Sequence, residues 1–282
     1  MLLLIDAGNT RIKWALAAPG AAAGQWLASG VVGQAESDGL AEQWRDLDVD
    51  AVLVSNVAGP AVRAALTAYL AAAPARHGAR PEVTWFASVA SLAGVQNRYR
   101  DPASLGCDRF ASLIGARTVR PRQSAIVATC GTATTVDAID AQGAFIGGMI
   151  LPGLGLMAAS LAQRTAQLPQ IAAGSALAPA PPPATQLATP PALFADNTQD
   201  AIFSGCLAAQ AGAIERAVAA HGGAHCLLSG GAAAWIAPHL SISFTLVENL
   251  VLIGLQAAAQ AASGASASVD SITASTGAGN PC

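Results

Sequence analysis

Asp6 stands where a buried strand ends and a turn begins. The run "LLLIDAGNTRIKW" places four apolar residues before Asp6 and a second, alternating run after the Gly8-Asn9-Thr10 step. A short apolar run, a turn and an alternating run indicate two strands joined by a tight hairpin, and Gly-Asn suits its apex. Asp6 then lies beside exposed backbone N–H groups, which suits a metal-bound phosphate. The alternative is a plain hairpin with a turn aspartate.

A second carboxylate stands at the start of a helical run. In "NRYRDPASLGCDRFASLIGA" the Gly106-Cys107-Asp108-Arg109 step precedes apolar residues at helical spacing. A carboxylate near a helix N-terminus is stabilised in its ionised form by the helix dipole. Asp108 is therefore a candidate functional carboxylate, and the alternative is a structural carboxylate paired with Arg109.

The hairpin pattern occurs twice. "SAIVATCGTATTVDAID" repeats the order of apolar run, glycine turn and alternating run, and Gly131 aligns with Gly8. This weak internal duplication predicts two similar α/β domains, each offering a glycine hairpin to a shared cleft. Two such hairpins hold nucleotide phosphates through backbone N–H groups. Their coincidence is more informative than either turn alone.

The elements around these hairpins predict two domains and a tail. We expect an N-terminal domain over residues 1–118, a C-terminal domain over 119–262 and a disordered tail over 263–282, with a Pro-rich loop at 178–191. In the first third, the pattern predicts strands at Leu2–Asp6, Arg11–Ala17, Trp26–Val32, Ala51–Ser55 and Val83–Phe86, and helices at Gly39–Leu47 and Pro60–Ala72.

Composition excludes several classes of function. The 282 residues are 53% hydrophobic and 11% charged, with a net charge of -3 and no long basic run. These values argue against a nucleic-acid-binding surface. The uncharged stretch at 141–163 is interrupted by glycines and a proline, so we expect no membrane span. Five cysteines without a CxxC pair indicate reduced thiols in a cytoplasmic protein.

An ordered series of motifs resembles type III pantothenate kinase, from the start of the chain to about Ala262. It includes Asp6-x-Gly8-Asn9-Thr10, Asn97-x-Tyr99-x-x-Pro102-x-x-Leu105-Gly106-x-Asp108-Arg109, Gly131-Thr132-Ala133-Thr134-Thr135-x-Asp137 and Gly147-Gly148-x-Ile150-x-Pro152-Gly153. "SLAQRTAQLP", "NTQDAIFSG" and "LVLIGL" continue the series in the same order. A lone Gly-Asn-Thr is weak evidence, whereas this ordered series is strong.

The resemblance implies an α/β fold of two ribonuclease H-like domains of duplicated topology, the actin-like ATPase fold, with a nucleotide cleft between them. It also implies ATP-dependent phosphorylation of pantothenate to 4'-phosphopantothenate, the first step of coenzyme A biosynthesis. The family's members are similar in using Mg²⁺ with ATP and a monovalent cation, K⁺ or NH₄⁺. They are cytoplasmic homodimers. The resemblance therefore implies a homodimer with ATP and pantothenate as its ligands and with neither nucleic acid nor a membrane as a partner.

The resemblance also implies a role for each matching residue. Asp108 would accept the proton of the attacking hydroxyl, and Asp6 would hold the metal. Nucleotide binding would involve Asp6, Gly8, Asn9, Thr10, Gly131, Thr132, Thr134, Gly230 and Gly231. Pantothenate binding would involve Tyr99, Gly106, Arg109 and, from the partner subunit of a dimer, Thr198.

One position departs from the family pattern. Many members carry an aspartate two residues before the second glycine, where this chain has Thr129. Metal binding then rests on Asp6 with waters, or Asp137 compensates, or activity is weak. The alternatives to the kinase are a kinase-like regulatory protein without turnover, another small-molecule kinase of the superfamily, and a polyphosphatase.

Overall fold

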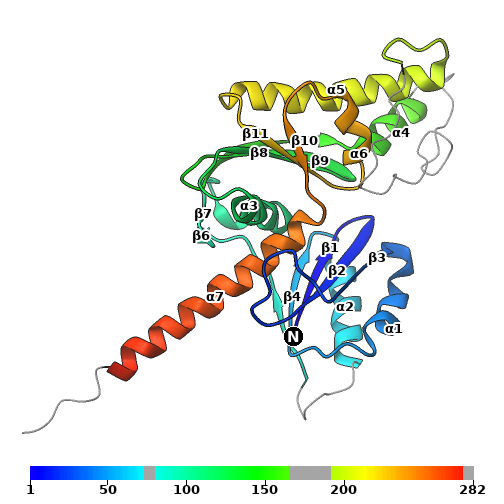
Figure 1. The fold of residues 1–282 in the computed structure, drawn as a ribbon. Coiled ribbons are helices and arrows are strands. Elements are labelled where there is room, and N and C mark those ends of the chain that lie inside the picture. The colour runs from blue at the N-terminus through cyan, green and yellow to red at the C-terminus, as the bar shows by residue number, and fades with distance from the viewer. Residues whose placement is uncertain (73–79, 165–191, 276–282) are drawn as a thin grey trace, which may run out of the picture. The chain divides into compact units, whose positions relative to one another are not determined.

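The computed structural model describes residues 1–72, 80–164 and 192–275, and within them the chain forms two compact units. Unit 1 contains residues 1–97, 101–118 and the segment from Val251 onward. Unit 2 contains residues 98–100 and 119–250. Each unit is built around its own set of mixed β-strands (Figure 1).

Unit 1 contains a five-stranded sheet in the order β3-β2-β1-β4-β5. β1 pairs antiparallel with β2 and parallel with β4, β2 pairs antiparallel with β3, and β4 pairs parallel with β5. The strands are β1 (Leu2–Ala7), β2 (Arg11–Ala17), β3 (Ala28–Gly33), β4 (Ala51–Asn56) and β5 (Glu82–Trp85), and a short hairpin of β6 (Ser91–Leu92) and β7 (Val95–Asn97) follows. The α-helices are α1 (Leu40–Trp44), α2 (Pro60–Ala72), α3 (Cys107–Val119) and α7 (Leu250–Ser275), and the 3-10 turns are η1 (Gln34–Gly39) and η2 (Pro102–Ser104).

Both faces of the unit 1 sheet are buried at β1. Successive side chains of this strand point to opposite faces, and each set packs in a different cluster. Leu3 lies in a cluster with Leu40 of α1 and Leu66 of α2. The next residue, Leu4, lies in a second cluster with Leu252 of α7. This explains why β1 appears in the sequence as a continuous apolar run. Helix α2 has the bounds predicted for it and begins with Pro60, at a position that tolerates proline.

Gln256 fixes α7 to the loop between β2 and β3. Its side-chain oxygen accepts hydrogen bonds from the Gly24 amide at 2.9 Å and the Trp26 indole at 3.0 Å. Its side-chain nitrogen donates to the carbonyls of Ala21 at 3.1 Å and Ala22 at 3.2 Å. Gln256 is 1% exposed, so its amide depends on these four bonds instead of on water.

Replacing Gln256 with leucine is expected to lower the free energy of unfolding by about 2 kcal/mol, because one buried side chain loses four hydrogen bonds together. Urea denaturation followed by circular dichroism measures the shift in midpoint. Gln260→Leu is the matched control, since Gln260 is exposed on the same helix and makes one such bond, to Ala21. Equal shifts for the two variants would contradict this account of Gln256.

Unit 2 repeats the topology of unit 1. Its own strands follow the order β12-β11-β8-β9-β10, with β8-β9 and β9-β10 antiparallel and β8-β11-β12 parallel. They are β8 (Ala125–Cys130), β9 (Ala133–Ile139), β10 (Ala144–Pro152), β11 (His225–Ser229) and β12 (Phe244–Leu246). The helices are α4 (Leu154–Arg164), α5 (Thr198–Ala220), α6 (Ala233–Ile236) and the turn η3 (Ala237–His239). The duplicated topology predicted from the two hairpins is confirmed.

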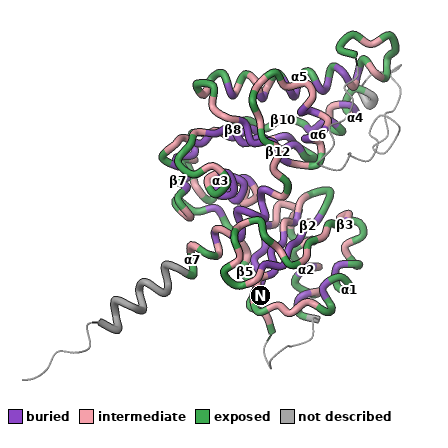
Figure 2. The backbone as a smooth tube through the Cα atoms, in the orientation of Figure 1, coloured by how far each residue is buried: buried purple, intermediate pink, exposed green. Residues whose placement is uncertain are grey.

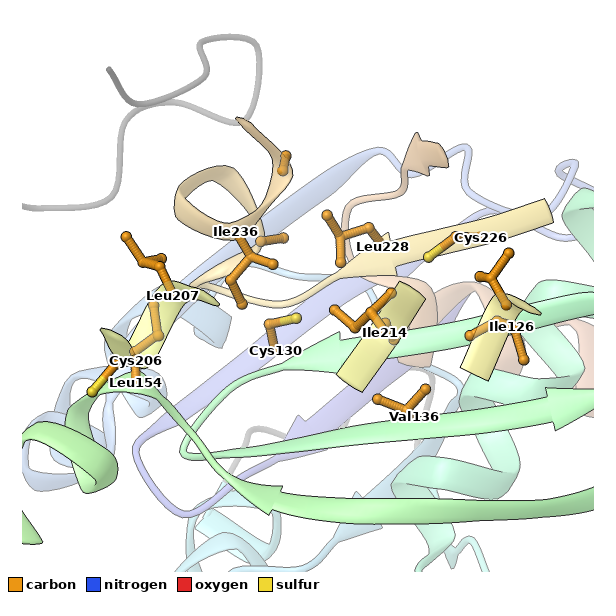
Figure 3. Packing of buried hydrophobic residues seen from close by; sticks show 14 of the residues in the cluster. Ile126, Cys130, Val136, Leu154, Cys206, Leu207, Ile214, Cys226, Leu228 and Ile236 are labelled. Carbon is orange, nitrogen blue, oxygen red and sulfur yellow. The ribbon is translucent and has the colours of Figure 1, made fainter. Parts of the chain in front are cut away.

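The core of unit 2 lies between the sheet and α5. Buried positions recur every three or four residues along α5, as its interrupted purple colouring indicates (Figure 2). Figure 3 shows Ile214 of this helix among Cys130 of β8, Val136 of β9 and Leu228 of β11. Burial raises the pKa of Cys130 to about 12, so this thiol is a neutral packing group. Among the described residues, Cys107, Cys130, Cys206 and Cys226 are free thiols.

Several expected bounds differ from those observed. The helix expected at Gly39–Leu47 is a 3-10 turn followed by the short α1. The domain division expected at 119–262 differs from the contact grouping, which places Val251 onward with unit 1. Helix α7 continues to Ser275, into the segment expected to be a tail. The Pro-rich segment 178–191 lies outside the described residues. No described helix has the length and apolar character needed to cross a membrane.

Candidate active site

Asp6 lies near the end of β1 between two polar neighbours. In the sheet register it stands beside Lys13 of β2 and Ser55 of β4. Residues paired in this way share one face of the sheet. Burial is the main cause that raises the pKa of Asp6 to about 7, and the charge of Asp108 raises it further, whereas Lys13 lowers it. Asp6 and Asp108 therefore interact electrostatically within unit 1.

Asp108 occupies the first turn of α3, and that turn is anchored to the end of β4. The thiol of Cys107 lies 3.4 Å from the Ser55 hydroxyl and donates to the carbonyl of Asn56 at 3.6 Å. The Asp108 carboxylate accepts a hydrogen bond from the backbone amide of Arg109 at 2.8 Å. Burial raises the pKa of Asp108, opposed by the amide and the guanidinium of Arg109. A half-buried carboxylate whose pKa is raised is chemically suited to accept a proton.

Gly106 leaves room for this carboxylate. A Cβ atom at Gly106 would lie 2.7 Å from the Asp108 side-chain oxygen. The carbonyl of Gly106 accepts a bond from the Ser88 hydroxyl at 3.4 Å. Arg109 is 7% exposed. Three of the predicted residues, Gly106, Asp108 and Arg109, are therefore held together at the start of α3.

The Gly8–Thr10 turn links β1 and β2 as predicted. The Gly8 amide donates to the Arg11 carbonyl at 3.1 Å, which closes the hairpin. The Thr10 carbonyl accepts from the Gln34 amide at 2.9 Å, which ties the turn to the segment after β3. Asn9 and Thr10 are exposed at the tip, so they are accessible to an anionic ligand.

The predicted nucleotide-binding residues of unit 2 meet around the end of β8. The Gly131–Thr132 turn is exposed, and the Thr132 carbonyl accepts from the Gly153 amide at 3.0 Å. Gly230 lies beside it with a φ of +97°, and a Cβ atom there would lie 2.3 Å from the Cys130 carbonyl oxygen. Only glycine allows this close approach of two backbone segments. Gly231 follows and is exposed.

Thr134 is the one residue of this group whose side chain is buried. It pairs with Cys130 in the β8-β9 register and is 1% exposed. Cys130 belongs to the core between the sheet and α5. The Thr134 side chain therefore lies on the core face, and only its backbone is suitable for contact with a nucleotide.

The predicted pantothenate residues fall into two sets. Gly106 and Arg109 belong to unit 1, whereas Tyr99 and Thr198 belong to unit 2. The Tyr99 ring stacks on Phe145, with 5.8 Å between ring centroids. Thr198 is exposed at the first position of α5. The Asn197 side chain caps that helix by accepting from the Asp200 amide at 3.0 Å.

A magnesium–nucleotide complex fits the carboxylates of unit 1. Among the described residues, no group of three or more His, Cys, Asp or Glu side chains gathers as a metal site. Mg²⁺ with a nucleotide needs only one or two carboxylates, because phosphate oxygens and waters supply its other ligands. Burial is the main cause that raises the pKa of Asp6, and the charge of Asp108 adds to it; a bound cation would stabilise the ionised carboxylate against both.

Sequence reasoning missed Lys13 and Ser55 as neighbours of Asp6. The signal was present in the hairpin, since a turn centred on Asn9 and Thr10 pairs Asp6 with Lys13. Ser55 is brought in by the parallel pairing of β1 with β4, and no local pattern predicts that register.

Comparison with known proteins gives matches over most of the chain. Residues 2–220 match the family model described as type III pantothenate kinase. A type III pantothenate kinase of Janthinobacterium sp. (strain Marseille) is 56% identical over 269 residues, which cover 92% of this chain and 97% of that relative. A type III pantothenate kinase of Herminiimonas arsenicoxydans is 52% identical, with the same coverage.

The fold also resembles a solved structure. A candidate 2-dehydro-3-deoxygalactonokinase from Sinorhizobium meliloti matches with a TM-score of 0.52 and 19% identity, covering 93% of this chain and 96% of that chain. At this identity the likeness shows the fold alone. It is the actin-like ATPase and sugar kinase fold that the sequence predicted.

Proposed function

The chain belongs to the type III pantothenate kinase family, and from this premise we propose that it phosphorylates pantothenate with ATP to form 4'-phosphopantothenate, the first step of coenzyme A biosynthesis. The structural observation that carries the proposal is the pair of interacting carboxylates, Asp6 and Asp108, within unit 1. Phosphoryl transfer depends on positioning and charge neutralisation more than on covalent chemistry. A carboxylate for the metal and one for the proton satisfy these needs.

Asp108 acts on the acceptor. Its carboxylate takes the proton from the primary hydroxyl of pantothenate as that oxygen bonds to the γ-phosphorus, and the bond from this phosphorus to the bridging oxygen breaks to release ADP. Burial raises the pKa of Asp108, which makes the carboxylate a stronger base. Gly106 and Arg109, together with Tyr99 and Thr198, hold the pantothenate.

The remaining residues act on the nucleotide. Asp6 holds Mg²⁺, directly or through water, and this ion neutralises charge on the phosphates when bound. The turns at Gly8–Thr10 and Gly131–Thr132 present backbone N–H groups to the phosphates. Thr134 contributes through its backbone, and Gly230-Gly231 lets the adenosine approach. The phosphoryl transfer also requires a monovalent cation, K⁺ or NH₄⁺.

The test is mass-detected conversion of pantothenate by the purified chain. We expect product with ATP and Mg²⁺ in K⁺ or NH₄⁺ buffer, and much less in Na⁺ buffer. Loss of ATP without an organic acceptor would point to hydrolysis instead. If folded protein makes no 4'-phosphopantothenate with saturating ATP, Mg²⁺ and K⁺, the proposal is wrong.

A homodimer is also proposed, and exposed apolar side chains of unit 2 support it. Large apolar side chains are exposed on β10, on α4 and before α5, and Phe194 is 91% exposed. Large exposed apolar side chains are candidate contacts of a protein interface, and twofold dimers are the commonest assemblies. The exposed side chains are Ile146, Met149, Ile150, Leu156, Leu161, Leu193 and Phe194. Thr198 follows Phe194 in the chain and would reach the partner's pantothenate pocket.

Light scattering after size-exclusion chromatography is expected to give the mass of a dimer for the wild type. Ile150→Asp should shift that mass to a monomer, because a charge on this exposed strand position would be buried unpaired in the interface. Leu27→Asp is the control, since Leu27 is equally exposed, at 62% against 64% for Ile150, but belongs to unit 1. A monomeric wild type would contradict the proposed dimer.

A further inference from the structure

Thr129 occupies the position in unit 2 that Asp6 occupies in unit 1. β1 and β8 hold matching places in two five-strand orders, β3-β2-β1-β4-β5 and β10-β9-β8-β11-β12, and each residue lies two positions before the glycine of the following turn. Asp6 stands between Lys13 and Ser55. Thr129 stands between Thr135 and Ser229. Each set of three neighbours forms a row across its sheet. The row in unit 1 includes two charged side chains, whereas the row in unit 2 consists of three hydroxyl side chains.

The Thr129 hydroxyl lacks a partner. Its oxygen is buried and has no hydrogen-bond partner among the described residues, although the residue as a whole keeps some exposed surface. A buried hydroxyl without a partner is unfavourable. Rotation about χ1 to another staggered position moves the hydroxyl away from this site. Part of Thr129 is accessible, so a rotation that turns the hydroxyl toward that part would offer it to a bound ligand.

The location of the row limits what this ligand is. Thr129 precedes the exposed Gly131–Thr132 turn, and Gly230 follows Ser229 directly. Both glycine steps belong to the proposed nucleotide site, so the row directly adjoins, along the chain, the backbone that is proposed to bind phosphate. A hydroxyl donates a hydrogen bond to a phosphate oxygen, whereas an ionised carboxylate only accepts and would repel the phosphate.

We propose that Thr129, Thr135 and Ser229 form a neutral hydroxyl row that binds a phosphate group of the nucleotide through Thr129. The row is therefore a phosphate subsite, in contrast to the metal-binding carboxylate of unit 1. This inference rests on the proposed function, because it takes the nucleotide as the ligand. Thr129 is a binding residue in this account. The kinase therefore stays active with a threonine at the position where many family members carry an aspartate.

The experiment is calorimetric titration with ADP, which measures binding without turnover, in Mg²⁺ and in excess EDTA. Thr129→Val removes the hydroxyl at nearly constant volume and is expected to weaken ADP binding by about tenfold, the effect of a hydrogen bond to a charged group. Thr129→Ser should bind within about threefold of the wild type, since it keeps the donor. Thr129→Asp should weaken binding most in EDTA, where no cation screens the repulsion between carboxylate and phosphate.

Thr245→Val is the matched control, since Thr245 is an exposed threonine on β12 of the same sheet. It should bind ADP as the wild type does, and thermal melting monitors the folding of every variant. Wild-type affinity in folded Thr129→Val would overturn the inference, as would tighter binding by Thr129→Asp in Mg²⁺, the result expected of a metal site. A wild type that binds no ADP overturns the proposed function itself and the inference with it.

Discussion

Replacing Asp108 with asparagine is expected to lower kcat for pantothenate phosphorylation by about 10²- to 10⁴-fold, the usual contribution of a general base. Asparagine has nearly the same shape, and its side-chain oxygen still accepts the bond that the Arg109 amide donates to Asp108. What is lost is the ability to take a proton. The KM for pantothenate should change by less than about threefold, because an interaction made only in the transition state is removed. Initial rates of 4'-phosphopantothenate formation, detected by mass, measure both constants.

Asp101→Asn is the matched control for this variant. Asp101 lies seven residues earlier in the chain, is exposed and accepts a hydrogen bond from the Ala103 amide at 3.1 Å. Asparagine serves equally well at such a cap, so activity should stay near the wild-type value. A kcat for Asp108→Asn within about tenfold of the wild type would remove Asp108 from the role of base.

The duplicated sheets were predictable because their signal is local. An apolar run, a glycine turn and an alternating run specify a hairpin wherever they occur, and Gly8 and Gly131 mark the two copies. The packing of α7 was not predictable in the same way. Val251 and Leu252 join the cluster of unit 1, but the apolar face of a helix has the same pattern whichever sheet it covers. The domain division expected at 119–262 therefore differs from the observed grouping.

The site was predictable in part for the same reason. Asp6 was identified by the hairpin turn that follows it, and Asp108 by the start of the helix in which it lies. Their electrostatic interaction joins residues far apart in the chain, and only the family resemblance placed them in one site. The environment of the Asp108 turn was not visible in the sequence. It depends on the Ser55 and Asn56 contacts of Cys107, which arise from tertiary packing of α3 against β4.

Replacing Asp6 with asparagine is expected to have two opposite effects. The rate at subsaturating Mg²⁺ and ATP should fall by about 10²-fold, because a charge that stabilises the transition state is lost. The ligand-free protein should become more stable at pH 8, by roughly 2 kcal/mol. Burial and Asp108 raise the pKa of Asp6 to about 7, so at pH 8 the folded wild type carries an unfavourable charge that the variant lacks.

The stability difference between the variant and the wild type should depend on pH if it comes from the charge of Asp6. A change in packing alone would give a difference that is independent of pH. The unfolded chain loses the Asp6 proton near pH 4, whereas the folded chain keeps it up to about pH 7. The ionisation of Asp6 therefore lowers the stability of the wild type as pH rises between these values, and this contribution is absent from the variant. Urea denaturation should show a small difference at pH 4.5 and the full difference at pH 8.

The same measurement in an Asp108→Asn background tests the source of the shift. Removing the charge of Asp108 removes the second of the two causes that raise the pKa of Asp6, so the stability gained by Asp6→Asn at pH 8 should shrink. Such non-additivity is the signature of two groups that interact directly. A gain that is independent of pH, or unchanged in the Asp108→Asn background, would mean that the asparagine acts through packing and that the two carboxylates do not form one electrostatic site.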